Sequence, residues 1–78
     1  MSLVIALSDL SKARRFVADG EKYMVHQRGF VDTLERQGYD TFDAILFLEC
    51  LEAMQGQYVA HRDRLEERVL RMVKPSDE

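Results

Sequence analysis

The short stretch Gly38-Tyr39-Asp40 most strongly constrains how this chain folds, because it holds a helix stop signal and a helix start signal. Glycine readily adopts the left-handed backbone conformation that ends helices, so Gly38 predicts a helix C-terminus. Asp40 can accept hydrogen bonds from the first N–H groups of a new helix, and Asp43 adds a second carboxylate in its first turn. Signals this close leave room only for a tight reversal between two antiparallel helices.

Two long amphipathic segments flank this turn, and neither is interrupted by proline. Ser8 is a suitable N-cap for the first helix, and Ser2 is the alternative because Leu3, Ala6 and Leu10 already follow the heptad spacing. Pro75 ends the second helix. The expected elements of this single domain are helix one over about 8–37, the turn over 38–40, helix two over about 41–73 and a polar tail over 74–78.

Each segment carries apolar residues at alternating spacings of three and four, as an antiparallel helical coiled coil requires. The seam expected on helix one comprises Leu10, Ala13, Val17, Gly20, Met24, Gln27, Val31 and Leu34. The seam expected on helix two comprises Ala44, Phe47, Leu51, Met54, Tyr58, His61, Leu65 and Met72, with Arg68 at a position where an apolar residue is due. Packing from a common turn pairs positions whose numbers sum to roughly 78, which places Gly20 opposite Tyr58. The sequence therefore predicts an all-α, two-helix antiparallel hairpin.

Further apolar side chains lie beside both seams, so the apolar surface is wider than one helix pair can cover. These candidate interface residues are Phe16, Tyr23, Phe30, Ile45, Cys50 and Val59. A small domain with one cysteine has no internal disulfide to supplement its core. We therefore expect a homodimer, most simply a four-helix bundle made of two hairpins, and a heterologous helical protein is the alternative partner.

Composition limits the partners and the cellular compartment that we expect for the protein. The chain has 78 residues and a formal net charge of −3, which gives no general attraction to nucleic acid or to anionic membranes. Its 46% hydrophobic content is dispersed, and no apolar run approaches the roughly 20 residues that cross a bilayer. The N-terminal residues lack the features of a secretory signal. We expect a cytoplasmic protein that does not associate with membranes.

Several residues together resemble a known group of proteins. They are Gly20-Glu21, Gln27, Leu34, Gly38, Asp40-Thr41, Ala44, Leu48, Ala60-His61-Arg62 and Arg64. In this pattern the chain resembles small uncharacterised helical-hairpin proteins of alpha-proteobacteria, especially rhizobia, over roughly residues 17–65. It departs from that group at Tyr39, where the group tends to have histidine. The resemblance implies a hairpin fold and a bacterial cytosolic setting, and it implies no activity.

Polar residues on the expected seams are the most informative candidates for a site. Gln27 and His61 lie at seam positions, and an unpaired buried polar group costs on the order of 1–3 kcal/mol. With Glu21, Arg62 and Arg64 in reach of the opposite helix, we expect these five residues to form a buried polar network.

Sequence motifs for metal binding or catalysis are weaker signals than these polar seam residues. Di-iron helical bundles use Glu-x-x-His, whereas the residue three before His26 is Tyr23 and the residue three before His61 is Tyr58. Cys50 lies on an aliphatic helix flank with no neighbouring base. We therefore expect no catalytic residues, no metal and no cofactor.

The interpretation that follows is a non-enzymatic protein–protein interaction or regulatory module that self-associates. One alternative is a nucleic-acid-binding accessory protein that uses basic residues at the open end of the hairpin, namely Lys12, Arg14, Arg15, Arg62, Arg64, Arg68 and Arg71. Acidic residues are interleaved with them, so we do not expect nucleic acid as a partner. The other alternative is a small-ligand or metal-binding helical bundle around Tyr23, Tyr58 and His61.

Overall fold

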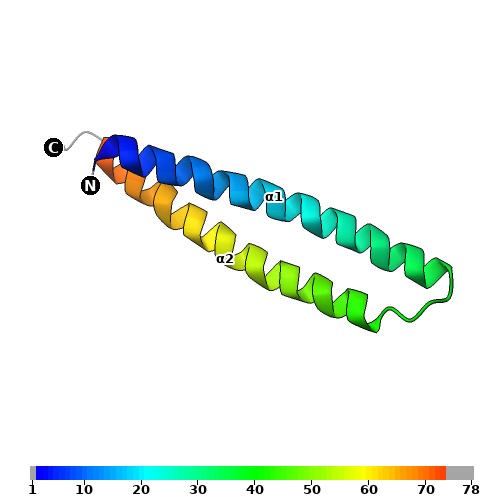
Figure 1. Ribbon diagram of the computed structural model, residues 1–78. Coiled ribbons are helices and arrows are strands. Elements are labelled where there is room, and N and C mark those ends of the chain that lie inside the picture. The colour runs from blue at the N-terminus through cyan, green and yellow to red at the C-terminus, as the bar shows by residue number, and fades with distance from the viewer. Residues whose placement is uncertain (1, 74–78) are drawn as a thin grey trace.

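The computed structural model describes residues 2–73 and shows two helices packed side by side as a hairpin (Figure 1). Helix α1 spans Leu3–Arg36 and helix α2 spans Phe42–Val73. The chain reverses at the connection between them, so the start of α1 lies beside the end of α2. The predicted all-α antiparallel hairpin is confirmed, and the predicted tail over 74–78 lies outside the described residues.

Helix α1 begins at Leu3, so the expected start near residue 8 is wrong. Ser2 is the N-cap, and its side-chain oxygen accepts a hydrogen bond from the Ile5 N–H at 3.1 Å. The early start is stabilised by packing, because Ala6 continues the seam and is fully buried. Ser8 instead lies exposed within the helix.

The end of α1 has the hydrogen bonds of a Schellman motif. Gly38 has a φ of 78°, and its N–H donates to the Glu35 carbonyl at 3.1 Å. The Tyr39 N–H donates to the Leu34 carbonyl at 2.9 Å. These two bonds occupy helix carbonyls that would otherwise lack partners, which is why a residue with positive φ ends the helix here.

The start of α2 uses the carboxylate that the sequence indicated. Asp40 Oδ1 accepts a hydrogen bond from the Phe42 N–H at 3.0 Å, and the Thr41 carbonyl accepts the first helical bond from Ile45 at 2.9 Å. Thr41 therefore precedes the helix, which begins at Phe42 rather than at residue 41. Asp43 lies in the first turn, where a negative charge is favoured.

The core is concentrated at the open end of the hairpin, away from the turn. Its cluster of buried residues consists of Ala6, Leu10, Ala13, Leu65 and Val69. In the middle and toward the turn, the residues classed as buried are Met24, Gln27 and Gln55. Among the described residues, no large side chain is less than 2% exposed. One hairpin therefore buries its apolar residues incompletely.

The seam predicted on α1 is confirmed, because all its positions are buried or half-buried. The seam predicted on α2 is only half right. Its column Ala44, Leu51, Tyr58 and Leu65 does face α1, but Phe47, Met54 and His61 are exposed. Their places on the seam are taken by Leu48, Gln55, Arg62 and Val69. This rotation explains the apparent anomaly at Arg68, which lies outside the seam.

Candidate interaction face

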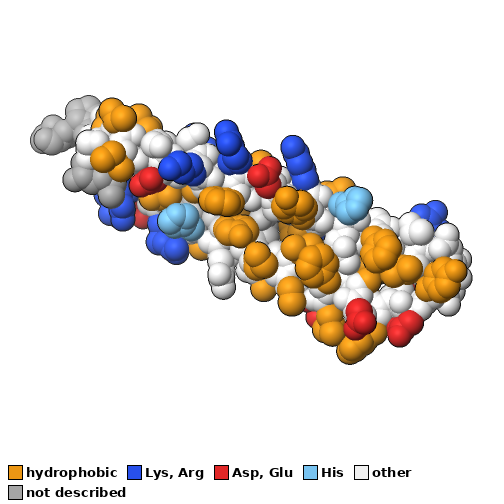
Figure 2. Space-filling view, in the orientation of Figure 1, with side chains coloured by type: hydrophobic (Ala, Val, Ile, Leu, Met, Phe, Trp, Pro, Cys, Tyr) orange, Lys and Arg blue, Asp and Glu red, His pale blue; other side chains and the backbone are white. Residues whose placement is uncertain are grey.

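Exposed apolar residues gather along one side of the hairpin. Five of them are 47–64% exposed: Phe16, Tyr23 and Phe30 on α1, and Phe47 and Met54 on α2. Together with the half-buried Tyr58, these residues are called the aromatic face. In Figure 2, hydrophobic side chains cover both helices from the middle of the hairpin toward the turn. The face occupies the part of the molecule where the core is thinnest.

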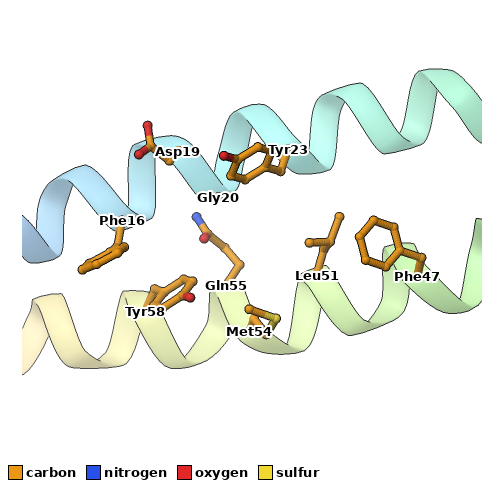
Figure 3. Close-up of a pocket in the computed structure, with 9 residues that line it drawn as sticks. All are labelled: Phe16, Asp19, Gly20, Tyr23, Phe47, Leu51, Met54, Gln55 and Tyr58. Atoms are coloured by element: carbon orange, nitrogen blue, oxygen red, sulfur yellow. The ribbon is translucent and has the colours of Figure 1, made fainter.

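A groove of about 390 Å³ runs through the middle of the aromatic face. Figure 3 shows its walls, with Phe16 and Tyr23 from α1 and Phe47, Met54 and Tyr58 from α2. Phe16 and Tyr58 stack across the helix pair with ring centroids 5.5 Å apart and an angle of 15° between ring planes. The groove is thus an apolar hollow whose aromatic walls are already ordered by contact between the helices.

The base of the groove is formed by Gly20 and Gln55, which lie against each other (Figure 3). Gln55 is 7% exposed, and its Nε2 donates a hydrogen bond to the Val17 carbonyl at 2.8 Å. Its Oε1 is buried without a hydrogen-bond partner and lies where a Cβ on Gly20 would project. The predicted partner of Gly20 is Tyr58 to within one helical turn, and the observed partner is Gln55, three residues earlier, so the missing side chain makes room for an amide rather than for a ring.

Gln27 makes the same kind of contact in the opposite direction. It is 9% exposed, and its Nε2 donates to the Ala44 carbonyl on α2 at 2.9 Å. Each helix therefore sends one buried glutamine amide to a backbone carbonyl of the other. These bonds satisfy polar groups inside the seam and help to fix the register of the two helices.

The predicted buried polar network is wrong for the hairpin, apart from Gln27. Glu21, His61 and Arg64 are exposed, because α2 is rotated relative to the expected seam. Arg62 is half-buried, but its guanidinium donates to its neighbour Asp63 at 2.9 and 3.1 Å. The sequence reasoning missed Gln55, although its spacing of seven from Leu48 was the signal that could have found it.

The other side of the hairpin carries two ion pairs between the helices. Arg14 Nη2 lies 3.2 Å from Glu66 Oε2, and Arg28 Nη2 lies 3.7 Å from Glu52 Oε2. Both ion pairs join α1 to α2, and this side is called the salt-bridged flank. This flank is solvated, and exposed ion pairs of this kind contribute only roughly 0–1 kcal/mol each to the free energy of unfolding. The two sides of the hairpin thus differ in character.

The predicted interface residues divide between these two sides. Phe16, Tyr23 and Phe30 all lie on the aromatic face. Ile45 and Val59 are half-buried and lie seven residues from Glu52, along the salt-bridged flank. They do not extend the aromatic face, and their place in an interface stays a prediction. Cys50 is exposed and free of any disulfide, and it lies outward of Phe47 and Met54.

The two histidines line different hollows of the described hairpin. His61 lines a separate hollow near the open end with Asp9, Lys12, Arg64 and Arg68, remote from Cys50 and His26. Within residues 2–73, no three His, Cys, Asp or Glu side chains are placed to share a metal ion. Over the same residues, neither helix is long and apolar enough to cross a membrane.

Comparisons with family models, with curated proteins and with solved structures give no match to this chain. The resemblance to alpha-proteobacterial hairpin proteins therefore remains a prediction that depends on the residues quoted above. The aromatic face is the feature of the hairpin that most needs a functional explanation.

Proposed function

We propose that this chain is a non-enzymatic interaction module that self-associates through the aromatic face, forming a four-helix bundle from two hairpins. The observation that supports this most strongly is that Phe16, Tyr23, Phe30 and Phe47, each at least half exposed, form a band along one side of a charged protein. Soluble monomers rarely leave a continuous apolar patch larger than a few hundred Å² in water. A second apolar face packed against this one removes the free-energy cost of exposing the apolar patch to water.

The surface area of the hairpin supports the same proposal. The chain exposes 5989 Å², whereas a compact monomer of this mass exposes about 4,900 Å². Its radius of gyration is 17.9 Å, compared with about 11.5 Å for a globular domain of this length. The excess is on the order of 1,000 Å², and a stable protein interface covers about 800 Å² on each partner. One partner hairpin is therefore enough to cover it.

The groove residues fit binding better than catalysis. Its lining offers one carboxylate, Asp19, one amide, Gln55, and two phenols, among apolar side chains. Acid–base or nucleophilic catalysis needs a base within hydrogen-bonding distance of the group it activates. Gln55, the amide among these groups, already donates a hydrogen bond to the Val17 backbone carbonyl. An apolar side chain of a partner is the natural occupant.

Sedimentation equilibrium at micromolar concentration tests the proposal. The wild-type chain, of mass 9.1 kDa, should sediment at about 18 kDa. Phe16→Asp/Phe30→Asp should sediment at about 9 kDa and remain helical by circular dichroism. Covering the exposed half of four phenylalanines per dimer is worth about 4 kcal/mol, so the double substitution should raise the dissociation constant roughly a thousandfold.

A matched control carries the same added charge away from the aromatic face. Val25 and Leu70 are each at least 60% exposed, and neither lines the groove. Val25→Asp/Leu70→Asp should therefore remain a dimer. A wild-type mass near 9 kDa, with the Phe16→Asp/Phe30→Asp variant equally well folded, would contradict self-association and leave a heterologous helical partner as the explanation for the face.

A further inference from the structure

We propose that the two hairpins of this dimer pack face to face and antiparallel, with the two-fold axis passing beside Met54. This inference depends on the proposed self-association and goes beyond it by fixing the direction and register of the second copy. It follows from the order of side chains along the exposed edge of α2, from the charges at the two ends of the hairpin and from the position of the groove.

Along the edge of α2 that borders the aromatic face, the charge of the side chains changes sign from one end to the other. Positions seven apart in α2 are Phe47, Met54, His61 and Arg68, with Asp40 seven residues earlier in the turn, and the adjacent row is Asp43, Cys50, Gln57 and Arg64. The acidic residues are at the turn and the basic residues are at the open end, with Met54 midway. Reversing a second copy about Met54 places position i opposite a position near 108 − i. Asp43 then meets Arg64, and Phe47 meets His61.

The charges distinguish this arrangement from the parallel one. Parallel packing would place the Asp40 and Asp43 carboxylates of both copies together at the turn end. It would also gather Lys12, Arg64 and Arg68 of both copies at the open end, where Asp9 is the acidic residue that lines the same hollow. Antiparallel packing brings each acidic end over a basic end, twice by symmetry. Such pairs contribute more to the choice of orientation than to affinity, because like charges in contact are penalised.

The position of the groove fits the same axis. Gly20 and Gln55 form its base at about the midpoint of α1, Leu3–Arg36, and of α2, Phe42–Val73. A two-fold axis at mid-length overlaps the hairpins along their whole length and places the two grooves against each other. Met54, 47% exposed at the groove wall, then projects toward the groove of the second copy (Figure 3).

Disulfide trapping tests the register directly. In Cys50→Ser/Met54→Cys the two introduced thiols lie at the axis, within the 4.4–6.8 Å Cα separation that a disulfide needs. Mild oxidation should convert most of this variant to a covalent dimer. Cys50→Ser/His61→Cys is the matched control, because the thiols of its two copies are about 20 Å apart along the helix axis of α2. It should stay reduced alone and cross-link when mixed with Cys50→Ser/Phe47→Cys.

Charge reversal gives a second readout that needs no thiol. Arg64→Asp should raise the dimer dissociation constant roughly tenfold, because two symmetry-related ion pairs become repulsive. Asp43→Arg/Arg64→Asp should restore most of the affinity. In a parallel dimer, Arg64 lies over Lys12 of the second copy, so Arg64→Asp would instead tighten association.

The outcomes separate this inference from the proposed function. A dimer by sedimentation in which Met54→Cys stays reduced overturns the antiparallel register and leaves self-association standing. Cross-linking between a Phe30→Cys chain and a Phe47→Cys chain, both with Cys50→Ser, would identify the parallel arrangement. A monomer by sedimentation overturns both proposals together.

Discussion

Gly20→Ala would place a methyl group against Gln55 Oε1. This atom is the one buried side-chain oxygen in the described part of the chain that lacks a hydrogen-bond partner. A Cβ at Gly20 would overlap Gln55 Oε1 and lie 2.8 Å from its Cδ. The amide must move, and the 2.8 Å hydrogen bond from Gln55 Nε2 to the Val17 carbonyl is then lost. Gly29 is the matched control, because a Cβ at this other interior position of α1 meets nothing within 4 Å.

Two opposing contributions set the expected size of the effect. Alanine is favoured over glycine by about 1 kcal/mol inside a helix, which is the full effect expected of Gly29→Ala. At Gly20 this gain is offset by about 1 kcal/mol if the displaced amide reaches water, and by up to about 3 kcal/mol if it stays buried and unpaired. Gly20→Ala should therefore be neutral to destabilising by about 2 kcal/mol, whereas Gly29→Ala stabilises.

Urea denaturation followed by far-UV circular dichroism measures this difference, with all variants at one protein concentration because self-association adds to stability. Gln55→Ala removes the obstructing amide, so Gly20→Ala should become stabilising by about 1 kcal/mol in that background. Equal stabilisation by Gly20→Ala and Gly29→Ala, with no coupling to Gln55, would refute the proposed packing of Gln55 against Gly20.

Three further changes test other parts of the hairpin. Gly38→Val should lower the free energy of unfolding by more than about 1 kcal/mol, since Gly38 has a φ of 78°, and Gly29→Val should be neutral or helpful; thermal melts in the opposite order would show that the account of the turn is wrong. Protein purified without a histidine tag should contain far less than stoichiometric transition metal by elemental analysis, and bound metal that disappears in His61→Ala would overturn this expectation. Glu66→Gln should cost less than about 1 kcal/mol in a urea titration, because its ion pair with Arg14 is exposed to solvent; a loss of several kcal/mol would assign that pair a larger role.

The turn was predictable because its physics is local. Gly38 and Asp40 act on backbone groups within a few residues of themselves, so their chemistry can be inferred without knowing what packs against them. The seam of α1 was predictable for a related reason, since apolar or small residues dominate it and Gln27 is the only polar exception. The start of α1 was misplaced because Ser2 and Ser8 have equal capping chemistry, and burial of Ala6 decides between them.

The seam of α2 could not be assigned from periodicity alone. Both Phe47 and Gln55 fit a heptad register, and apolar spacing does not show which side of a wide stripe faces the neighbouring helix. The sequence reasoning preferred the apolar residue, whereas the hairpin buries the glutamine and exposes the phenylalanine. A wide apolar stripe with its polar members turned inward is the pattern expected if the exposed part faces a further partner.

Coverage of the aromatic face by a second copy can be read from the oxidation rates of three methionines in the wild-type chain. Met24 is 6% exposed in the hairpin, Met72 is 38% exposed and Met54 is 47% exposed. Hydrogen peroxide converts accessible methionine to its sulfoxide, and peptide mass spectrometry gives a rate for each residue. The account predicts that Met54 reacts several-fold more slowly than Met72 at micromolar concentration, and that Phe16→Asp/Phe30→Asp abolishes this protection while Met24 stays slow. A Met54 that reacts at least as fast as Met72 at every concentration would contradict it.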